Sequence, residues 1–221
     1  MNSAENIEKM SPEERKYVGL HMQPEPFVQY FLVKTGDLYV NVDVFIEITK
    51  NSHIKYEYDK ERKALVCDRI LHTPLNYHFN YGFIPNTLSE DGDPIDAVVV
   101  MEDELVPGCY INCKIIGVLE TKDDAGVDPK LILLPSNAID PAWALYNNIN
   151  ELGNSTKDKI KYFFQHYKDL ENKKVEVGEF KDRMEAIKLY KESIERYSKN
   201  VINKVITDKS ENKITNYFAS V

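Results

Sequence analysis

Three carboxylates fall within six residues in the segment Asp91-Gly92-Asp93-Pro94-Ile95-Asp96. Carboxylates this close repel one another when all are ionised, and a hard divalent cation is what most readily holds them together. Because every donor is an oxygen atom, the segment suits Mg²⁺, Mn²⁺ or Ca²⁺. A solvated acidic turn, with Asp91 as a capping residue, is the alternative interpretation, and the segment alone does not decide between the two.

An EF-hand calcium loop is excluded at particular positions. Such a loop needs an oxygen ligand at its fifth position and glycine at its sixth. Counted from Asp91, those positions hold Ile95 and Asp96. A cation site in this segment must therefore be of another kind.

A second acidic turn, which contains Asp123, Asp124 and Asp128, also joins two apolar segments. A curled sheet can bring two such turns to the same opening, where the aspartates would bound one cavity. One Mg²⁺ takes only one or two carboxylates and keeps several waters, so the pattern predicts more than one metal ion. Sites with two metals are typical of phosphoryl chemistry.

Basic side chains on neighbouring segments are suited to the phosphate oxygens of a substrate. They are Lys55, Arg69, Lys130 and Lys168, and tyrosine hydroxyls would add neutral donors. Lys55, Glu57 and Arg69 also share one face of an expected hairpin, so a cross-strand ion pair is a structural alternative for them. Glu47, on the polar side of an expected strand, is by default a solvent-exposed residue.

The net charge of −8 is concentrated in one part of the chain. Residues 90–128 contain eleven Asp or Glu and two Lys, a balance of −9, which leaves +1 for the remainder. A negative field of this kind is unsuited to binding nucleic acid and suited to collecting cations.

The chain has no apolar run of eighteen residues and no basic and apolar leader at its start. We therefore expect no membrane association and a cytoplasmic location. Cys67, Cys109 and Cys113 are odd in number and have no C-x-x-C spacing. This pattern predicts reduced thiols buried in the core.

Apolar residues alternate in the first part of the chain and follow a helical period in the last part. The alternation predicts short antiparallel strands over 37–49, 54–59, 64–71, 98–101, 109–119 and 131–134, and the helical period predicts helices over 154–170, capped by Asn154-Ser155-Thr156, and over 187–201. This order predicts an α+β fold, a small closed or nearly closed barrel with C-terminal helices packed on it. We expect an N-terminal arm over 1–38, one domain over 39–205 and a tail over 206–221.

The acidic segment stands in order with four further motifs. These are Ile54-Lys55-Tyr56-Glu57, Val66-Cys67-Asp68-Arg69, Asn80-Tyr81-Gly82-Phe83-Ile84-Pro85 and Tyr167-Lys168-Asp169. From about Val44 to about Leu170, the set closely resembles the soluble family I inorganic pyrophosphatases, whose signature is the aspartate segment. The C-terminal helix looks most like the plant and protist branch. The resemblance implies hydrolysis of pyrophosphate to two phosphates, essential Mg²⁺ and a five-stranded barrel of OB type, and we expect a homo-oligomer.

The resemblance also implies roles for individual residues. Asp91, Asp96 and Asp128 are similar to the ligands of the most tightly bound metal ion, and Asp96 would also contact a second ion. Asp123 and Asp128 would hold a third ion. Glu57 would contact a further ion that arrives with the substrate. Asp93 resembles the general base. Lys55, Arg69, Tyr81, Lys130, Tyr167 and Lys168 match the phosphate-binding groups. Glu47 and Asp124 fall where the family keeps further acids behind the metal ligands.

The implied chemistry agrees with these residue types. A metal lowers the pKa of a bound water towards about 7, so Asp93 has only to orient this water and take its proton. Lysine and arginine stabilise charge on the phosphate, and no covalent intermediate is required. The chain departs from the family at Tyr77-His78, where Tyr-Pro is usual, which leaves the role of Tyr77 open.

Two other classes of protein remain as alternatives: a non-catalytic OB-type module, and a two-metal phosphodiesterase or nucleotide hydrolase. The acidic patch disfavours a module that binds nucleic acid, because stacking platforms need basic neighbours. The sequence contains no G-x-x-x-x-G-K-[ST] motif, so P-loop enzymes are excluded.

Overall fold

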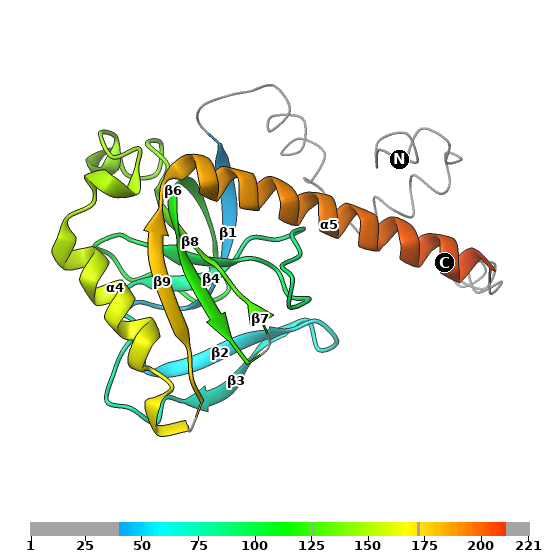
Figure 1. The fold of residues 1–221 in the computed structure, drawn as a ribbon, viewed down its shortest axis with the longest axis horizontal. Coiled ribbons are helices and arrows are strands. Elements are labelled where there is room, and N and C mark those ends of the chain that lie inside the picture. The colour runs from blue at the N-terminus through cyan, green and yellow to red at the C-terminus, as the bar shows by residue number, and fades with distance from the viewer. Residues whose placement is uncertain (1–39, 125, 172, 211–221) are drawn as a thin grey trace.

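Five strands close into a ring in the computed structural model, which describes residues 40–124, 126–171 and 173–210, with side chains through residue 203. The ring follows the order β1–β4–β5–β8–β6 and closes because β1 also pairs with β6. Its strands are β1 (Asn41–Ile48), β4 (Asn80–Phe83), β5 (Asp96–Val99), β8 (Lys130–Pro135) and β6 (Tyr110–Asp123). The predicted small five-stranded barrel is confirmed (Figure 1). The predicted arm, residues 1–38, lies outside the described residues.

β5 and β8 are parallel neighbours, although the sequence pattern predicted antiparallel strands throughout. Their register places Asp96 opposite Lys130 and Val99 opposite Leu133. The chain returns through β6, which is antiparallel to β8, before β8 begins. Because parallel strands start at the same edge of a sheet, the loops that precede β5 and β8 meet there. These loops are the two acidic turns.

β1 does not keep the strict alternation of its apolar residues. Its register against β4 shifts between Ile46 and Ile48. As a result Val44 and Ile46 belong to one core cluster and Ile48 belongs to the other. The same irregularity buries Glu47, which is only 9% exposed. The default interpretation of Glu47 as a solvent-exposed residue is therefore wrong. Shifts of this kind often redirect a side chain next to a functional site.

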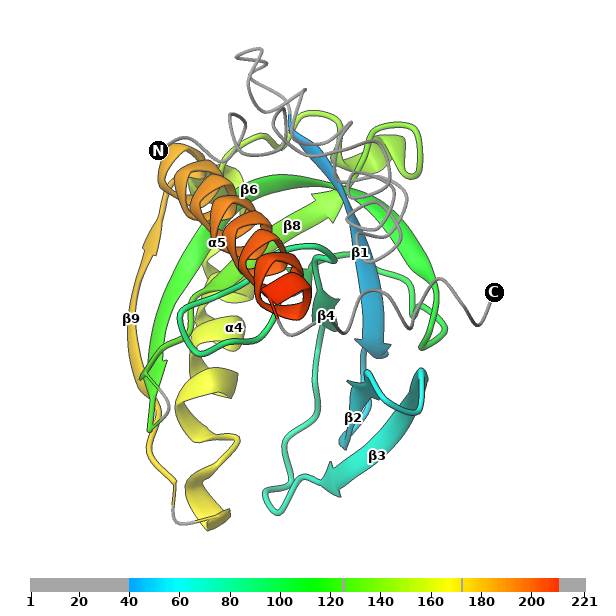
Figure 2. The ribbon, with the colours of Figure 1, turned by 90° about the vertical axis from the view of Figure 1, so that its right-hand side faces the viewer.

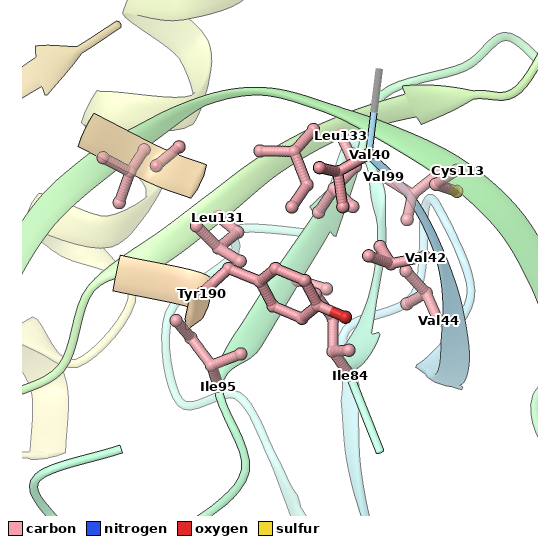
Figure 3. Packing of buried hydrophobic residues seen from close by; sticks show 14 of the residues in the cluster. Val40, Val42, Val44, Ile84, Ile95, Val99, Cys113, Leu131, Leu133 and Tyr190 are labelled. Atoms are coloured by element: carbon pink, nitrogen blue, oxygen red, sulfur yellow. The ribbon is translucent and has the colours of Figure 1, made fainter. Parts of the chain in front are cut away.

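Two helices pack against residues that alternate along the strands. α5 (Arg183–Ser210) brings the ring of Tyr190 among aliphatic side chains that include Ile95 and Leu131 (Figure 3). α4 (Asn154–His166) packs Phe163 and Phe164 into the second cluster. The predicted packing of C-terminal helices on the barrel is confirmed.

The ends of both helices differ from the prediction. The cap of α4 is Gly153, which makes no side-chain hydrogen bond, so Asn154 is the first helical residue and not the cap. Leu170 lies past the helix, in the 3₁₀ turn η3 (Asp169–Glu171), and this change of path leaves it 63% exposed. α5 continues through residues 206–210 of the predicted tail, and the rest of that segment lies outside the described residues.

β2 (Ile54–Asp59) and β3 (Ala64–Ile70) form the predicted hairpin as a separate two-stranded sheet. In both views it lies at the lower end of the molecule (Figures 1 and 2). Cys67 on β3 is exposed and not buried as predicted, because no third strand in the described part of the chain pairs with the hairpin. Cys113 is buried in the core.

Further short elements were not predicted from the sequence. β9 (Glu176–Lys181) lies between the two helices and pairs with β6, so the order is not simply strands followed by helices. The strand β4 of the ring was not predicted either, and the remaining elements are β7 (Gly126–Val127) and the 3₁₀ turns η1 (Pro141–Trp143) and η2 (Ile149–Glu151). Across the described residues, no helix has the length and apolar character needed to span a membrane.

Candidate active site

One cavity of about 500 Å³ is lined by the hairpin, by the barrel edge where β5 and β8 begin, and by the end of α4. Every residue that the sequence predicted to be catalytic, metal-binding or phosphate-binding lines this cavity. These residues are Asp93; Glu57, Asp91, Asp96, Asp123 and Asp128; and Lys55, Arg69, Tyr81, Lys130, Tyr167 and Lys168. Glu47 lines it as well, whereas Asp124 is exposed and does not. The two acidic turns therefore meet at one opening.

Lys130 sits between the carboxylates of Asp96 and Asp128, with only 5% of its side chain exposed. The parallel register of β5 and β8 sets this arrangement, because it makes Asp96 and Lys130 neighbours. Burial raises the pKa of Asp128 to about 7, with Asp96 adding to the shift and Lys130 opposing it. Burial lowers the pKa of Lys130, but the two carboxylates more than offset this, and the ammonium stays charged.

The first acidic turn is shaped by its glycine and by Asp91. Gly92 has φ of +95°, which L side chains rarely adopt. The amide of Asp93 donates to Asp91 Oδ1 at 3.0 Å, so Asp91 does cap the turn, as the structural alternative proposed. A carboxylate has a second oxygen, so capping does not exclude cation binding. Burial raises the pKa of Asp91, and the nearby charges of Asp93 and Asp96 add to the shift.

Asp93 projects from this turn with 76% of its side chain exposed. Its nearest basic partner is Lys60 in the hairpin turn, whose Nζ lies 3.4 Å from Asp93 Oδ1. Lys60 was not predicted as a site residue, because nothing local connects the hairpin turn with the acidic turn. The pair spans the opening between the hairpin and the barrel.

The hairpin carries the cations Lys55 and Arg69 directly opposite each other on β2 and β3. Lys55 pairs with Glu57 on its own strand and lies 3.4 Å from Asp68 Oδ2. The structural alternative placed Arg69 in an ion pair with Lys55 and Glu57 across the strands, but Arg69 does not pair with Glu57. Its Nη1 donates to Asp68 Oδ2 at 2.5 Å, and its Nε donates to Glu171 Oε1 at 3.0 Å.

Glu47 connects the hairpin with the barrel. Its Oε1 accepts a hydrogen bond from the amide of Tyr58 at 2.6 Å. Burial raises the pKa of Glu47 to about 7; the bond from Tyr58 opposes the shift and the charge of Asp96 adds to it. Alternation alone could not predict this burial, because it depends on the register shift in β1; the family resemblance did place Glu47 behind the metal ligands.

Aromatic contacts hold the end of α4 in place. Tyr167, the C-cap of α4, stacks on Phe163 with ring centroids 5.1 Å apart, and Lys168 Nζ lies 3.1 Å from Asp123 Oδ2. Burial raises the pKa of Tyr81 far above its ordinary value, so its phenol remains a neutral donor.

The loop that contains Tyr77, His78 and Phe79 packs against Phe163 of α4, although His78 is unusual for the family. Its ring packs edge-on against Phe79, with centroids 4.9 Å apart, and burial lowers its pKa. Tyr77 is 2% exposed and contacts Phe163 at 4.6 Å between ring centroids. Tyr77 thus belongs to the core and does not line the cavity.

Further lining residues were not assigned from the sequence. They are Tyr56, Tyr58, Lys60, Asp68, Phe83, Pro94 and Lys173. Four of them, Tyr56, Asp68, Phe83 and Pro94, lie inside motifs that the sequence displayed, so their position could have been inferred. Tyr58, Lys60 and Lys173 lie outside those motifs, and only the packing of distant segments brings them to the cavity.

The donor chemistry of the cavity fits a hard divalent cation. Eight carboxylates line it, and its described lining includes neither histidine nor cysteine. Across the described residues no three Asp, Glu, His or Cys side chains converge on a single point; the ammonium groups of Lys130 and Lys168 contact the carboxylates instead. Raised pKa values, as at Asp91 and Asp128, mark carboxylates that added positive charge would stabilise.

Comparison with known sequences gives a consistent result. The family model described as inorganic pyrophosphatase matches residues 44–198. The inorganic pyrophosphatase of Helicobacter pylori is 48% identical over 155 residues, which are 70% of this chain and 90% of the relative. That of Nanoarchaeum equitans is 48% identical over 161 residues, 72% of this chain and 99% of the relative.

Solved structures agree. The H. pylori inorganic pyrophosphatase matches with a TM-score of 0.70 at 46% identity, covering 73% of this chain and 95% of that one. A Trypanosoma cruzi vacuolar soluble pyrophosphatase, at 24% identity and a TM-score of 0.65 over 72% of this chain and 69% of that one, supports the fold alone. Since the family model spans most of the chain, and relatives nearly half identical match over almost their whole length, this chain belongs to the inorganic pyrophosphatase family.

Proposed function

We propose that this protein hydrolyses inorganic pyrophosphate to two phosphate ions by in-line attack of a water molecule, with no covalent intermediate. As a member of its family the chain is an inorganic diphosphatase, a hydrolase. The observation that carries the proposal is one cavity in which the two acidic turns face lysines, an arginine and tyrosines. That combination can bind a polyanion and divalent cations together.

Mg²⁺ would be held by the carboxylates of the two turns and the hairpin. Asp91, Asp96 and Asp128 would form the tightest site, Asp123 would join Asp128, and Glu57 would meet an ion brought by the substrate. When bound, the metal would neutralise phosphate charge and lower the pKa of a coordinated water towards about 7. The residues' own contribution is to present oxygen ligands on a rigid strand edge.

The phosphate groups would bind to Lys55, Arg69, Lys130 and Lys168, with Tyr81 and Tyr167 as neutral donors. Charge makes these cations necessary, because each pair of unit charges 4 Å apart repels by about 4 kcal/mol at an effective dielectric near 20. In this structure Lys130 and Lys168 contact carboxylates. Substrate binding would exchange these contacts for phosphate oxygens, which keeps each ammonium paired.

Asp93 is the general base of the proposed reaction. It would orient the attacking water and accept its proton, a task that requires an accessible carboxylate. The 76% exposure of its side chain supports this role over that of an enclosed ligand. No other nucleophile is invoked, since water attacks phosphorus directly.

Several finer expectations are part of the same proposal. The relatives at 48% identity are bacterial and archaeal, which supports a kinship nearer to them than to the plant and protist branch suggested by the C-terminal helix. We propose a homo-oligomer, which light scattering would test.

Three free cysteines support a cytoplasmic location, and the acidic cavity argues against nucleic acid as a partner. Residues 39–205 would form the catalytic domain, with 1–38 and 206–221 as appended segments.

Phosphate release is the direct test. Pyrophosphate, ATP and a phosphodiester should be compared with Mg²⁺ present and with excess chelator. We expect rapid Mg²⁺-dependent release from pyrophosphate and little from the other two. Preferential hydrolysis of the phosphodiester or of ATP would favour the two-metal phosphodiesterase or nucleotide hydrolase instead, and no release from any substrate would favour a binding module.

A further inference from the structure

Glu171 is a buried carboxylate that contacts a cation on the cavity wall. Only 6% of its side chain is exposed, and its Oε1 accepts a hydrogen bond from Arg69 Nε at 3.0 Å. Arg69 lines the cavity, whereas Glu171 does not. Glutamate is almost never buried unless it is paired. The side chain of Glu171 therefore reaches the cavity only through Arg69.

The two carboxylates on Arg69 fix the orientation of its guanidinium group. Nε donates to Glu171, and Nη1 donates to Asp68 Oδ2 at 2.5 Å. The guanidinium is planar and rigid, with five N–H donors in fixed directions. Fixing Nε and Nη1 therefore also fixes Nη2. Burial opposes the charge on Arg69, but the two carboxylates raise its pKa above the ordinary value.

The contact also joins two walls that are distant in sequence. Glu171 and Arg69 are 102 residues apart. Glu171 closes the turn after α4, where its amide donates to the carbonyl of Lys168 at 2.9 Å. Figure 1 shows the end of α4 and the hairpin at the same end of the molecule. Because the hairpin forms a sheet of its own, side-chain contacts such as this one must hold it in place.

We propose that Glu171 is a positioning residue for substrate: it holds the guanidinium of Arg69, and with it the hairpin wall, in the orientation that binds a phosphate group of pyrophosphate. The inference rests on the proposed function of Arg69. Without Glu171, Arg69 keeps only the carboxylate of its chain neighbour Asp68. Each substrate molecule must then reorder the guanidinium on binding, which weakens binding more than it slows the chemical step.

The first test compares Glu171→Gln and Glu171→Ala with the wild type at saturating Mg²⁺. We expect Glu171→Ala to raise KM for pyrophosphate about tenfold, the size of one hydrogen bond to a charged group, with a smaller change in kcat. Glu171→Gln keeps an acceptor for Arg69 and should raise KM less. The dissociation constant of inorganic phosphate, measured by calorimetry, should rise in the same order.

Glu179→Gln is the matched control. Glu179 also pairs with a cation, Lys161 Nζ at 2.7 Å, but its side chain is 75% exposed and lies outside the cavity lining. Its variant should have the KM of the wild type within about twofold, since exposed ion pairs contribute little. An equal rise in KM for Glu179→Gln would mean that any loss of negative charge has the effect, which would overturn the proposal.

The second test is a double-mutant cycle with Arg69→Met. In that background Glu171→Ala should change KM less than about twofold, because its effect passes through Arg69. A lower melting temperature with unchanged KM, or effects on KM that multiply in the double variant, would overturn the proposal. A wild-type KM in Arg69→Met would instead remove Arg69 from the substrate site, and this inference with it. A wild-type protein without pyrophosphatase activity would refute the proposed function itself.

Discussion

Asp96 and Lys130 begin two neighbouring strands of the barrel, whereas Lys55 and Glu57 lie on a hairpin outside it. The barrel pair is fixed by main-chain register, and Lys130 is 5% exposed. On the hairpin, Glu57 is 52% exposed, and the contact of Tyr58 with Glu47 ties the strand to the barrel. The difference suggests that the two walls of the cavity, the barrel edge and the hairpin, have different roles. An acidic edge fixed by main-chain register suits metal ions, and a cationic wall held by side-chain contacts suits a substrate that enters and two products that leave.

The largest expected effect concerns turnover at the barrel side of the cavity. Asp93→Asn and Asp96→Asn should each lower kcat by about 10²- to 10⁴-fold, which is the usual contribution of a general base to the rate. Steady-state kinetics over a Mg²⁺ series would measure this, and Asp96→Asn should raise the Mg²⁺ concentration for half-maximal rate more than Asp93→Asn does. Circular dichroism should stay that of the wild type. Near-normal turnover in either variant would contradict the role given to that residue.

Stability without metal should separate the two walls. Lys130→Met leaves Asp96 and Asp128 without their shared cation, which should cost about 3 kcal/mol of unfolding free energy, as for other buried pairs that lose one partner. Lys55 on the hairpin has a side chain that is 20% exposed. Lys55→Met should lower the free energy of unfolding by less than about 1 kcal/mol. Urea unfolding in chelator at pH 8 is the measurement. Equal losses would mean that the two walls do not differ in the way described.

The pH dependence of stability should reveal the buried carboxyl between the walls. The pKa of Glu47 is raised from 4.5 to about 7, and burial is the largest cause of the shift. Below pH 4.5 the group is protonated whether the chain is folded or unfolded. Between pH 4.5 and 7 the unfolded chain releases the proton first, so stability falls as pH rises and the full penalty is present above pH 7.

Glu47→Gln removes this titration while keeping an acceptor for the amide of Tyr58. Relative to the wild type, the variant should gain about 2–3 kcal/mol of stability between pH 4.5 and pH 8. Chemical unfolding across this range, in chelator, would measure the gain. A difference that stays constant with pH would show that Glu47 titrates normally.

The smallest effect is expected away from both walls. Lys159 is exposed on α4 and lies outside the cavity lining. Lys159→Ala should leave kcat/KM within about twofold and stability within about 0.5 kcal/mol of the wild type, as is usual for such surface changes. A larger loss of activity would mean that the functional surface extends beyond the two walls.

Local patterns predicted a large part of the fold. Alternation and period predicted the small barrel, the hairpin and the packed helices, and the motif resemblance predicted the five strands and the family; all are confirmed. Alternation and period report which side chains are apolar, but they do not report strand partners or register. The parallel pairing of β5 with β8, the added strand β9 and the burial of Glu47 depend on such partners, and for that reason alternation alone missed them.

The sequence by itself determined the chemical types at the site: oxygen ligands in two turns, cations and phenols on other segments, and the motifs that identify the family. These follow from side-chain chemistry and spacing, which do not need a fold. Only the tertiary structure decided which charges meet. The contact of Lys130 with Asp96 spans 34 residues, and that of Glu171 with Arg69 spans 102. Burial and pairing set the pKa and orientation of such groups, and both depend on how distant segments pack.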